Sequence, residues 1–337
     1  MSLNILRLAG IMALLVFTKV SLADVEMSNL DSFHELPKKM AALKALGWLP
    51  EQTLIAMDGD DTLTRMPCPV GEEKSPRNCQ YVGGPAWFTW QSDLLPSQGQ
   101  APSSACKKYC VAETFSGLLD ISAYLFAASR MEYAEAGQAK PLEVLALEGV
   151  RLMGLTARGD TNISATEMQF SYLPLTLTPT LSLFDLINKN APYFHASPFS
   201  GEVASIASPF LTCAGKVSPR PETYRNGTFY ASGQNKGVAL KCFLKAYSRS
   251  PQGSQKPIKN IIFIDDSLQN IKDVNNAFEA TGTYNVRAYH FTYLQAHKAL
   301  LTQKASGKPY REMAKKRWDQ LNSTLERALL EPSVGSN

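Results

Sequence analysis

This sequence has few histidines and a low net charge, and each of these properties argues against a class of function. Four histidines occur among 337 residues, and the chain lacks the His/Cys ligand clusters that a zinc-dependent hydrolase requires. The formal net charge is +4, which is too low to indicate a basic surface that binds nucleic acid. Internal repeats and low-complexity segments are absent too, which excludes solenoids and biased linkers. The remaining composition is that of a globular protein.

Long apolar runs are also missing, and the run near the N-terminus is short. Residues 8–17 are apolar, a basic residue precedes them, and Ser21-Leu22-Ala23 follows. This pattern is typical of a signal peptide, and the run is shorter than the roughly 20 residues that span a bilayer. We expect residues 1–23 to be cleaved and the chain to be exported without stable membrane insertion. The alternative is an uncleaved anchor.

Export would place the six cysteines in an oxidising compartment, where an even number favours disulfide bonds over metal binding. Proximity along the chain suggests two disulfide pairs. The two remaining cysteines either form a third pair or are free buried thiols. These pairs are Cys68–Cys79, Cys106–Cys110 and, as the open one, Cys213–Cys242.

Three short apolar runs that end in polar residues indicate buried parallel strands, at residues 53–57, 150–155 and 260–264. Helical patterns lie between or after these runs, at residues 142–148, 237–247 and 268–280. Strands that alternate with helices predict an α/β fold with a mainly parallel sheet.

Two stretches are too long to be simple connections in a compact sheet. They cover about residues 65–135 and 162–224, and we expect both to be insertions in a single domain of residues 24–337. A helix within residues 115–133 should pack back on the core. Apolar residues at near-helical spacing over residues 309–330 predict a terminal helix docked on the sheet.

Polar residues follow each predicted strand. Residues 58–62 (DGDDT) follow the first strand, residues 156–158 (TAR) follow the second, and residues 265–267 (DDS) follow the third, with Asn270 one turn later. Lys236 lies near the start of a predicted helix. In a parallel α/β sheet, ligand sites form beyond the carboxyl ends of the strands. We therefore expect these residues to share one site.

The order of these motifs resembles the haloacid dehalogenase-like (HAD) phosphatase superfamily, whose motifs are D-x-D-x-T, a Ser/Thr at a strand end, a Lys and an acidic pair. More narrowly, the segments GPAWFTWQSDLL, LTARG, NKG and FIDDSLQN are similar to an uncharacterised bacterial family of the DUF2608 type. The resemblance covers most of the chain after residue 23. It implies a Rossmann-like HAD core with inserted cap elements, and it supplies no substrate.

The resemblance also implies an Mg²⁺-dependent phosphohydrolase for a small phosphorylated substrate. Asp58 would bind the metal with one oxygen and attack phosphorus with the other, to give an aspartyl-phosphate. Asp60 would contact the metal through its carbonyl oxygen and act as the general acid and base, a role that needs a raised pKa.

The phosphoryl group would be bound by Thr156 and Lys236, whose charge offsets that of Asp58. Asp265 and Asp266 would complete the metal site, and Asp266 is the preferred direct ligand. Because Mg²⁺ takes oxygen ligands, a set of carboxylates suits it.

Several neighbouring residues have two interpretations. Arg158 pairs with a core acid or meets a substrate anion, and Asn270 is structural or an outer partner of the metal site. Trp87 and Trp90 form the core of a small insertion domain or cover the leaving group. Asp61, the variable position of D-x-D-x-T, is solvated or packs against an insertion.

Two other functions keep the same motifs. One is a catalytically silent HAD-fold binding protein, and the other is a phosphotransferase, which differs only in the acceptor. A receiver domain is excluded, because there the acidic pair precedes the phospho-accepting aspartate. The sequence leaves the oligomeric state open.

Overall fold

The computed structural model describes residues 24–67, 81–97, 99–194, 222–279, 282–303 and 307–330. The predicted signal peptide, residues 1–23, lies outside these ranges, as do Cys68, Cys79 and Cys213. Within them, no helix combines the length and the apolar character needed to cross a membrane.

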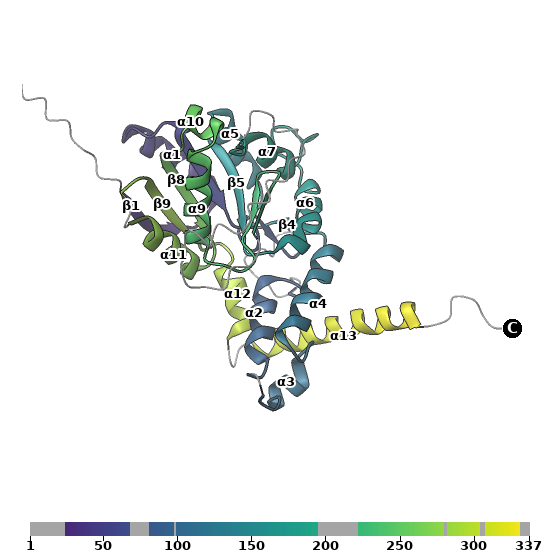
Figure 1. The fold of residues 1–337 in the computed structure, drawn as a ribbon. Coiled ribbons are helices and arrows are strands. Elements are labelled where there is room, and N and C mark those ends of the chain that lie inside the picture. Colours follow the sequence, from purple (N-terminus) through teal and green to yellow (C-terminus); the bar gives the residue numbers. More distant parts are fainter. Residues whose placement is uncertain are drawn as a thin grey trace, which may run out of the picture.

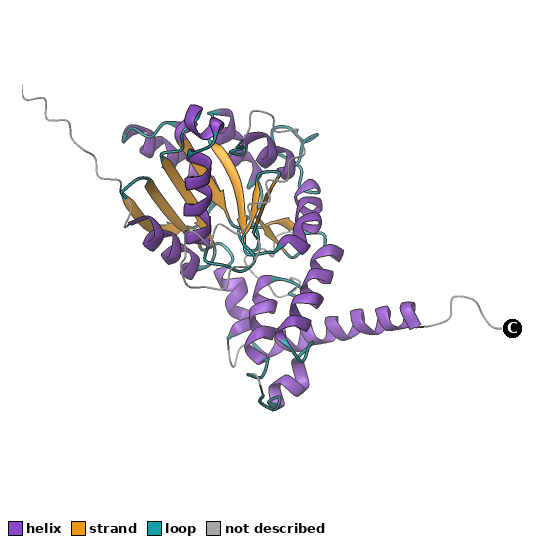
Figure 2. Ribbon diagram, in the orientation of Figure 1, coloured by secondary structure: helices purple, strands orange, loops and turns teal. Residues whose placement is uncertain are grey.

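A seven-stranded sheet forms the centre of the described fold (Figure 2). The strand order is β1-β9-β8-β2-β5-β7-β6, and every neighbouring pair is parallel except β6 with β7. The predicted mainly parallel α/β fold is thus confirmed. The strands are β1 (Val25–Leu30), β2 (Thr53–Met57), β5 (Arg151–Thr156), β6 (Thr223–Arg225), β7 (Thr228–Tyr230), β8 (Asn260–Asp265) and β9 (Asn285–Phe291).

The three predicted strands are β2, β5 and β8, and they lie next to one another at the centre of the sheet. Their sequences are continuously apolar because helices cover both faces of the sheet. In β2, Ile55 and Met57 pack into one apolar cluster, whereas Leu54 and Ala56 pack into another on the opposite face.

One face is covered by helices on which the first cluster lies, and the other face by two helices that carry the second cluster. The helices of the first face are α1 (Leu36–Ala45), α5 (Ala139–Leu147), α6 (Ile163–Ser171) and α7 (Leu183–Asn190). Those of the second face are α9 (Lys236–Ser248) and α11 (Leu268–Glu279). The predicted helices at residues 142–148, 237–247 and 268–280 correspond to α5, α9 and α11.

A group of helices lies below the sheet in Figure 1, and we name it the helical lobe. The chain reaches it twice, once after β3 and again after β9. Its members pack around a third apolar cluster that includes Trp87 and Trp90. They are α2 (Pro85–Leu94), α3 (Ser104–Tyr109), α4 (Phe115–Ala128), α12 (Gln295–Thr302) and α13 (Lys308–Leu330).

The terminal helix forms where the sequence predicts it, but the predicted docking on the sheet is wrong. Ala314 and Trp318 of α13 pack into the lobe cluster, and the rest of the helix projects away from the molecule (Figure 1). The apolar partner of this helix is the surface around Trp87, which the first long stretch supplies. The spacing of apolar residues indicates that a helix packs against an apolar surface, but it does not identify that surface. The sequence therefore could not predict where this helix docks.

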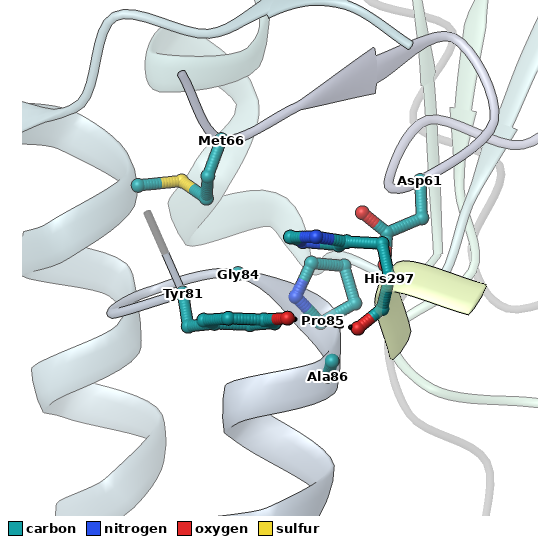
Figure 3. Close-up of a pocket in the computed structure, with 7 residues that line it drawn as sticks. All are labelled: Asp61, Met66, Tyr81, Gly84, Pro85, Ala86 and His297. Carbon is teal, nitrogen blue, oxygen red and sulfur yellow. Dashed lines mark hydrogen bonds between the residues drawn. The ribbon is translucent and has the colours of Figure 1, made fainter. Parts of the chain in front are cut away.

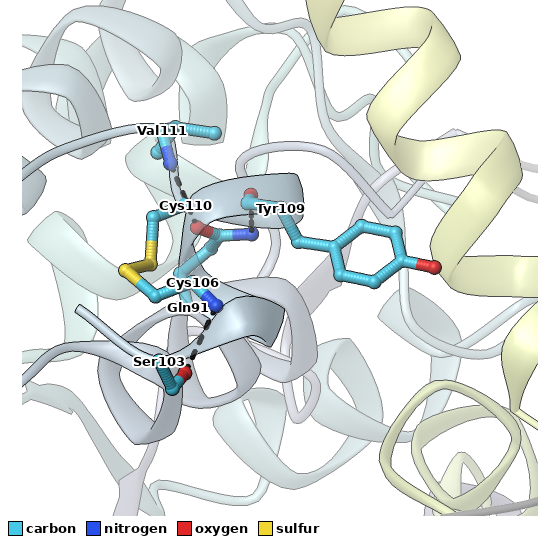
Figure 4. The surroundings of a disulfide bond; sticks show 6 residues. All are labelled: Gln91, Ser103, Cys106, Tyr109, Cys110 and Val111. Carbon is cyan, nitrogen blue, oxygen red and sulfur yellow. Dashed lines mark hydrogen bonds between the residues drawn. A yellow bond between two sulfur atoms is a disulfide. The ribbon is translucent and has the colours of Figure 1, made fainter.

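The predicted Cys106–Cys110 disulfide is present at the end of α3. The side chain of Gln91 holds this turn, donating to the Tyr109 carbonyl and accepting from the Val111 amide, both at 3.1 Å (Figure 4). Cys242 on α9 is also disulfide-bonded, so the alternative of a free thiol does not hold there.

Short elements complete the described chain. A two-stranded ladder joins β3 (Thr64–Arg65) to β4 (Glu132–Tyr133). The others are η1 (Phe33–Glu35), η2 (Pro50–Gln52), η4 (Asp160–Asn162) and α10 (Pro251–Gln255).

Candidate active site

Acidic residues gather at the carboxyl edge of the two central strands β2 and β8. These strands are parallel, with Met57 opposite Ile264, so the residues that follow them emerge side by side. The amide of Asp58 donates to the Ile264 carbonyl at 2.9 Å, and Asp265 and Asp266 follow directly. The structure therefore brings together the acids that the sequence placed in one site.

Lys236, the first residue of α9, lies among these acids. Its Nζ donates to Oδ1 of Asp58 and to Oδ2 of Asp265, the latter at 2.7 Å, and its side chain is 2% exposed. Burial lowers the pKa of Lys236, but Asp265 and Asp58 outweigh that effect and leave the pKa raised. Lys236 therefore carries a firm positive charge between two carboxylates.

The charge of Asp58 is not fully offset by this lysine. Burial raises the pKa of the Asp58 carboxyl, and the nearby charges of Asp265, Asp266 and Asp60 raise it further, against the opposing effect of Lys236. The ionised form of Asp58 is thus short of positive charge in the structure as it stands.

Asp266 has its own cationic partner, Lys298 of α12. Burial raises the pKa of Asp266 in spite of this lysine. Thr62 ties the two strand ends together, because its Oγ1 accepts from the Asp266 amide at 3.0 Å and donates weakly to Asp58 Oδ2 at 3.5 Å.

Asn270 lies behind Asp265 and fixes its orientation. The Nδ2 of Asn270 is 3.0 Å from each carboxylate oxygen of Asp265, and the amide of Ser267 donates to Asp265 Oδ1 at 2.8 Å. Asn270 is therefore a hydrogen-bond partner of Asp265.

Arg158 pairs with the second acid of the D-x-D motif. It donates to both oxygens of Asp60, at 2.9 and 2.6 Å. The other side of the guanidinium is held by Thr166 at 2.9 Å and Gln169 at 2.7 Å, and it lies 4.2 Å from the ring centroid of Phe126. Arg158 is therefore the partner of an acid, which is one of its two predicted positions.

Thr156 ends β5 and is buried beside the loop that carries Asp58. Its Oγ1 accepts from the amide of Arg158 at 3.2 Å. A Cβ placed on Gly59 would stand 3.6 Å from the same oxygen, so the loop passes within contact distance of Thr156. Trp87 and Trp90, in contrast, are buried in the interior of the helical lobe.

Asp61 lines a small pocket together with residues of α2 and α12 (Figure 3). Its backbone is left-handed, with φ of 57°. The side chain is 3% exposed, and its Oδ2 has no hydrogen-bond partner among the described residues. Burial raises the pKa of Asp61 to about 7, with Lys298 opposing. Asp61 therefore packs against an insertion, as one alternative had it.

The donor set of the cluster fits a divalent cation. Asp58, Asp265 and Asp266 each offer an oxygen within 4.8 Å of the others. The three carboxylates are paired with two lysines, Lys236 and Lys298, which leaves a formal charge of −1 on the ionised side chains. Buried charge of one sign is costly unless it is paired, and oxygen ligands are those that Mg²⁺ prefers.

Sequence reasoning missed three residues that contact Asp266. Lys298 pairs with its carboxylate, and His290 and Gln295 each have a side-chain nitrogen near its carbonyl oxygen, at 3.1 and 3.0 Å. They come from β9 and α12, a strand and helix that the prediction omitted. The signal was the run NVRAYHF at residues 285–291, whose β-branched and aromatic residues favour a strand. Ligand sites form beyond the carboxyl ends of parallel strands. A strand at residues 285–291 would therefore have directed attention to the segment after it, which contains Lys298.

A family model described as "Protein of unknown function (DUF2608)" matches residues 30–330 of the chain. No curated protein and no solved structure matches it.

Proposed function

We propose that this chain, which belongs to the DUF2608 family of proteins of unknown function, is a magnesium-dependent phosphohydrolase of the HAD type. The observation that carries the proposal is the buried cluster in which Asp58, Asp265 and Asp266 lie within 4.8 Å of one another and Lys236 contacts the first two. A carboxylate nucleophile, a neighbouring cation and further oxygen ligands are the groups that phosphoryl transfer requires.

The carboxylates of Asp58 and Asp266 would hold the Mg²⁺, with Asp265 behind them and the Asp60 carbonyl as a further ligand. The bound ion would supply the positive charge that lets an anionic carboxylate approach an anionic ester. Both oxygens of Asp265 accept hydrogen bonds, from Ser267, Asn270 and Lys236. In Asp266 the lysine contact is to Oδ2, which favours Asp266 as the direct ligand through its other oxygen.

In the first step, a carboxylate oxygen of Asp58 attacks phosphorus and the bond from phosphorus to the leaving oxygen breaks. Asp60 gives its proton to that oxygen as the product alcohol departs. Each oxygen of Asp60 accepts one bond from Arg158, and a carboxylate oxygen has a second acceptor position. Arg158 can therefore hold Asp60 in place while Asp60 exchanges a proton.

In the second step, Asp60 takes a proton from water as the water oxygen attacks phosphorus. The bond between phosphorus and Asp58 breaks, which releases inorganic phosphate and restores the Asp58 carboxylate and the protonated Asp60. Lys236 would offset charge on Asp58 throughout, and the hydroxyl of Thr156 would donate to a phosphoryl oxygen.

The proposed setting is export to an oxidising compartment, which agrees with the disulfide between Cys106 and Cys110. The proposed partner is a small phosphorylated compound, and the low net charge of the chain speaks against nucleic acid.

The test is hydrolysis of an aryl phosphate and of a panel of phosphorylated metabolites by the purified full chain with Mg²⁺. Asp58→Asn should lower kcat by about 10³-fold or more, because it removes the nucleophile. A chelator should abolish turnover. Asp319→Asn is the matched control, since Asp319 is an exposed aspartate on α13 whose partner is Lys315.

Turnover that survives Asp58→Asn or the chelator would contradict the mechanism. Transfer to an added alcohol in preference to water would make the protein a phosphotransferase. The absence of turnover on every ester would favour the catalytically silent binding protein.

A further inference from the structure

Helix α12 of the helical lobe holds Asp266 at two points. The Nζ of Lys298 contacts Oδ2 of the Asp266 carboxylate, and the Nε2 of Gln295 donates to the Asp266 carbonyl oxygen at 3.0 Å. Gln295 and Lys298 are three residues apart on α12, so they lie on the same face of the helix. Lys298 has no part in the two steps of the proposed hydrolysis.

The contact with Lys298 limits how Asp266 can meet a cation. A carboxylate can coordinate an ion with one oxygen or with both. The ammonium group of Lys298 occupies Oδ2, and its positive charge repels a second cation that approaches the same oxygen. Asp266 is therefore arranged to coordinate an ion through Oδ1 alone.

The other two carboxylates of the cluster are restricted in a similar way. Lys236 donates to Oδ1 of Asp58 and to Oδ2 of Asp265. The second oxygen of Asp265 accepts from the amide of Ser267 at 2.8 Å and from Asn270 at 3.0 Å. Each of the three carboxylates thus has a lysine on one oxygen, so none can give both oxygens to one ion while these contacts last.

Divalent cations differ in whether they need both oxygens of a carboxylate. Mg²⁺ takes six ligands in a strict octahedron, most often one or two carboxylate oxygens together with waters, whereas Ca²⁺ takes about 6–8 oxygens and readily binds a carboxylate through both. A site in which each carboxylate gives one oxygen meets the demand of Mg²⁺. The same site supplies too few protein oxygens for Ca²⁺.

We propose that Lys298 is a positioning residue that selects the cation: by occupying Oδ2 of Asp266, it makes this carboxylate coordinate through one oxygen and so favours Mg²⁺ over Ca²⁺. The inference rests on the proposed function, which supplies the divalent cation. Lys298 touches neither the ion nor the substrate and acts through Asp266. Because Lys298 belongs to α12, the choice of cation depends on the helical lobe.

Calorimetric titration of the full chain with Mg²⁺ and with Ca²⁺, in the absence of any substrate, measures this selection. The selectivity ratio is the Kd for Ca²⁺ divided by the Kd for Mg²⁺, and it should exceed one for the wild-type chain. Lys298→Met removes the ammonium group and frees Oδ2 of Asp266. Both ions gain from the lost positive charge, but only Ca²⁺ gains a second oxygen, so the ratio should fall at least about tenfold.

Four further variants connect the change to this contact. Lys298→Gln is a second neutral variant and should lower the ratio in the same direction, whereas Lys298→Arg keeps the charge and should keep the ratio. Gln295→Leu removes the other contact of α12 and should also keep it. Lys315→Met is the matched control, because Lys315 is about as exposed as Lys298 and pairs with Asp319 on α13. Melting temperatures in a chelating buffer show that each variant is folded.

The outcomes separate this inference from the proposed hydrolase. Equal tightening of both ions in the neutral variants would mean that Lys298 only competes by charge, and it would overturn the selection, as would an unchanged ratio or a wild-type preference for Ca²⁺. A fall of the same size in Gln295→Leu would assign the effect to the position of α12 and overturn the role of Oδ2. Selection of Mg²⁺ through Lys298 in a chain that hydrolyses no ester would support the inference and contradict the hydrolase. If the wild-type chain binds neither ion, both fail.

Discussion

At the scale of single residues, Lys236 is the charge on which the acidic cluster depends. It is nearly fully buried and forms ion pairs with Asp58 and Asp265. Among the described residues, neither carboxylate forms an ion pair with any other cation. A buried ion pair adds little over an apolar pair, but removing one partner leaves an uncompensated buried charge.

Lys236→Met should therefore lower the free energy of unfolding by about 3–5 kcal/mol without divalent cations. Urea denaturation in a chelating buffer measures the loss, and added Mg²⁺ should recover part of it. Lys315→Met is the matched control, because Lys315 pairs with Asp319 on the surface of α13 and should change stability by less than about 1 kcal/mol. Equal losses for the two variants would contradict the assignment.

His297, which lines the same pocket as Asp61, makes the stability of the fold depend on pH. Burial lowers the pKa of His297 from 6.5 to about 4, and the charges of Arg65 and Lys298 act in the same direction. The unfolded chain therefore binds a proton at a higher pH than the folded chain does. By linkage, the stability that this residue contributes is complete above pH 6.5 and is lost as pH falls towards 4.

His297→Phe keeps a ring against Tyr81 but cannot take up a proton. Between pH 7 and pH 4, the wild-type chain should lose up to about 3 kcal/mol more unfolding free energy than this variant. Denaturant titrations at the two pH values measure the difference. The same loss in both proteins would show that His297 is protonated without penalty in the folded state.

At the scale of elements, the position of Lys236 depends on how closely α9 approaches α11. A Cβ on Gly237 would lie 2.2 Å from the backbone oxygen of Asp273 on α11, a separation that no side chain can occupy. The glycine after Lys236 therefore lets the two helices touch, and the lysine at the start of α9 is held against the strand ends by that contact.

Gly237→Ala should force the helices apart and lower the free energy of unfolding by about 1–3 kcal/mol or more. It should also weaken Mg²⁺ binding, measured by calorimetry, because Lys236 moves with α9. Gly117→Ala in α4 is the matched control, since its new Cβ would come no closer than 3.4 Å to another atom. There the substitution should be neutral or stabilising by about 0.5–1 kcal/mol. A neutral Gly237→Ala would mean that α9 shifts freely.

The sequence predicted those elements whose burial can be recognised from their own residues. Strands β2, β5 and β8 were predicted within about one residue, because strands buried on both faces are continuously apolar. The acids at their ends followed from the geometry of parallel strands. Lys298 and the Asp61 pocket did not follow, because they depend on contacts between the loop after β2 and helices far along the chain. Local pattern carries no information on such contacts.

At the scale of the whole molecule, the described chain has three apolar clusters, and the third is separate from the sheet. Two clusters lie on the two faces of the sheet, whereas the third belongs to the helical lobe. The lobe meets the sheet edge at α12, where His297 lines the pocket with Asp61 and Lys298 pairs with Asp266. Motion of the lobe would therefore change both the pocket and the acidic cluster.

Trp318 of α13 is the residue through which this division can be tested. Its ring lies 6.3 Å from that of Trp87, so Trp318→Ala should cost the lobe about 2 kcal/mol of local stability through lost apolar burial. Hydrogen exchange should become faster in α2 and α4 and stay unchanged in β8 and α9, because regions open as separate cooperative units. Leu329→Ala, at a position 79% exposed, should change neither. Faster exchange in β8 and α9 as well would show that lobe and sheet unfold together, and the acidic cluster would then depend on α13 for its stability.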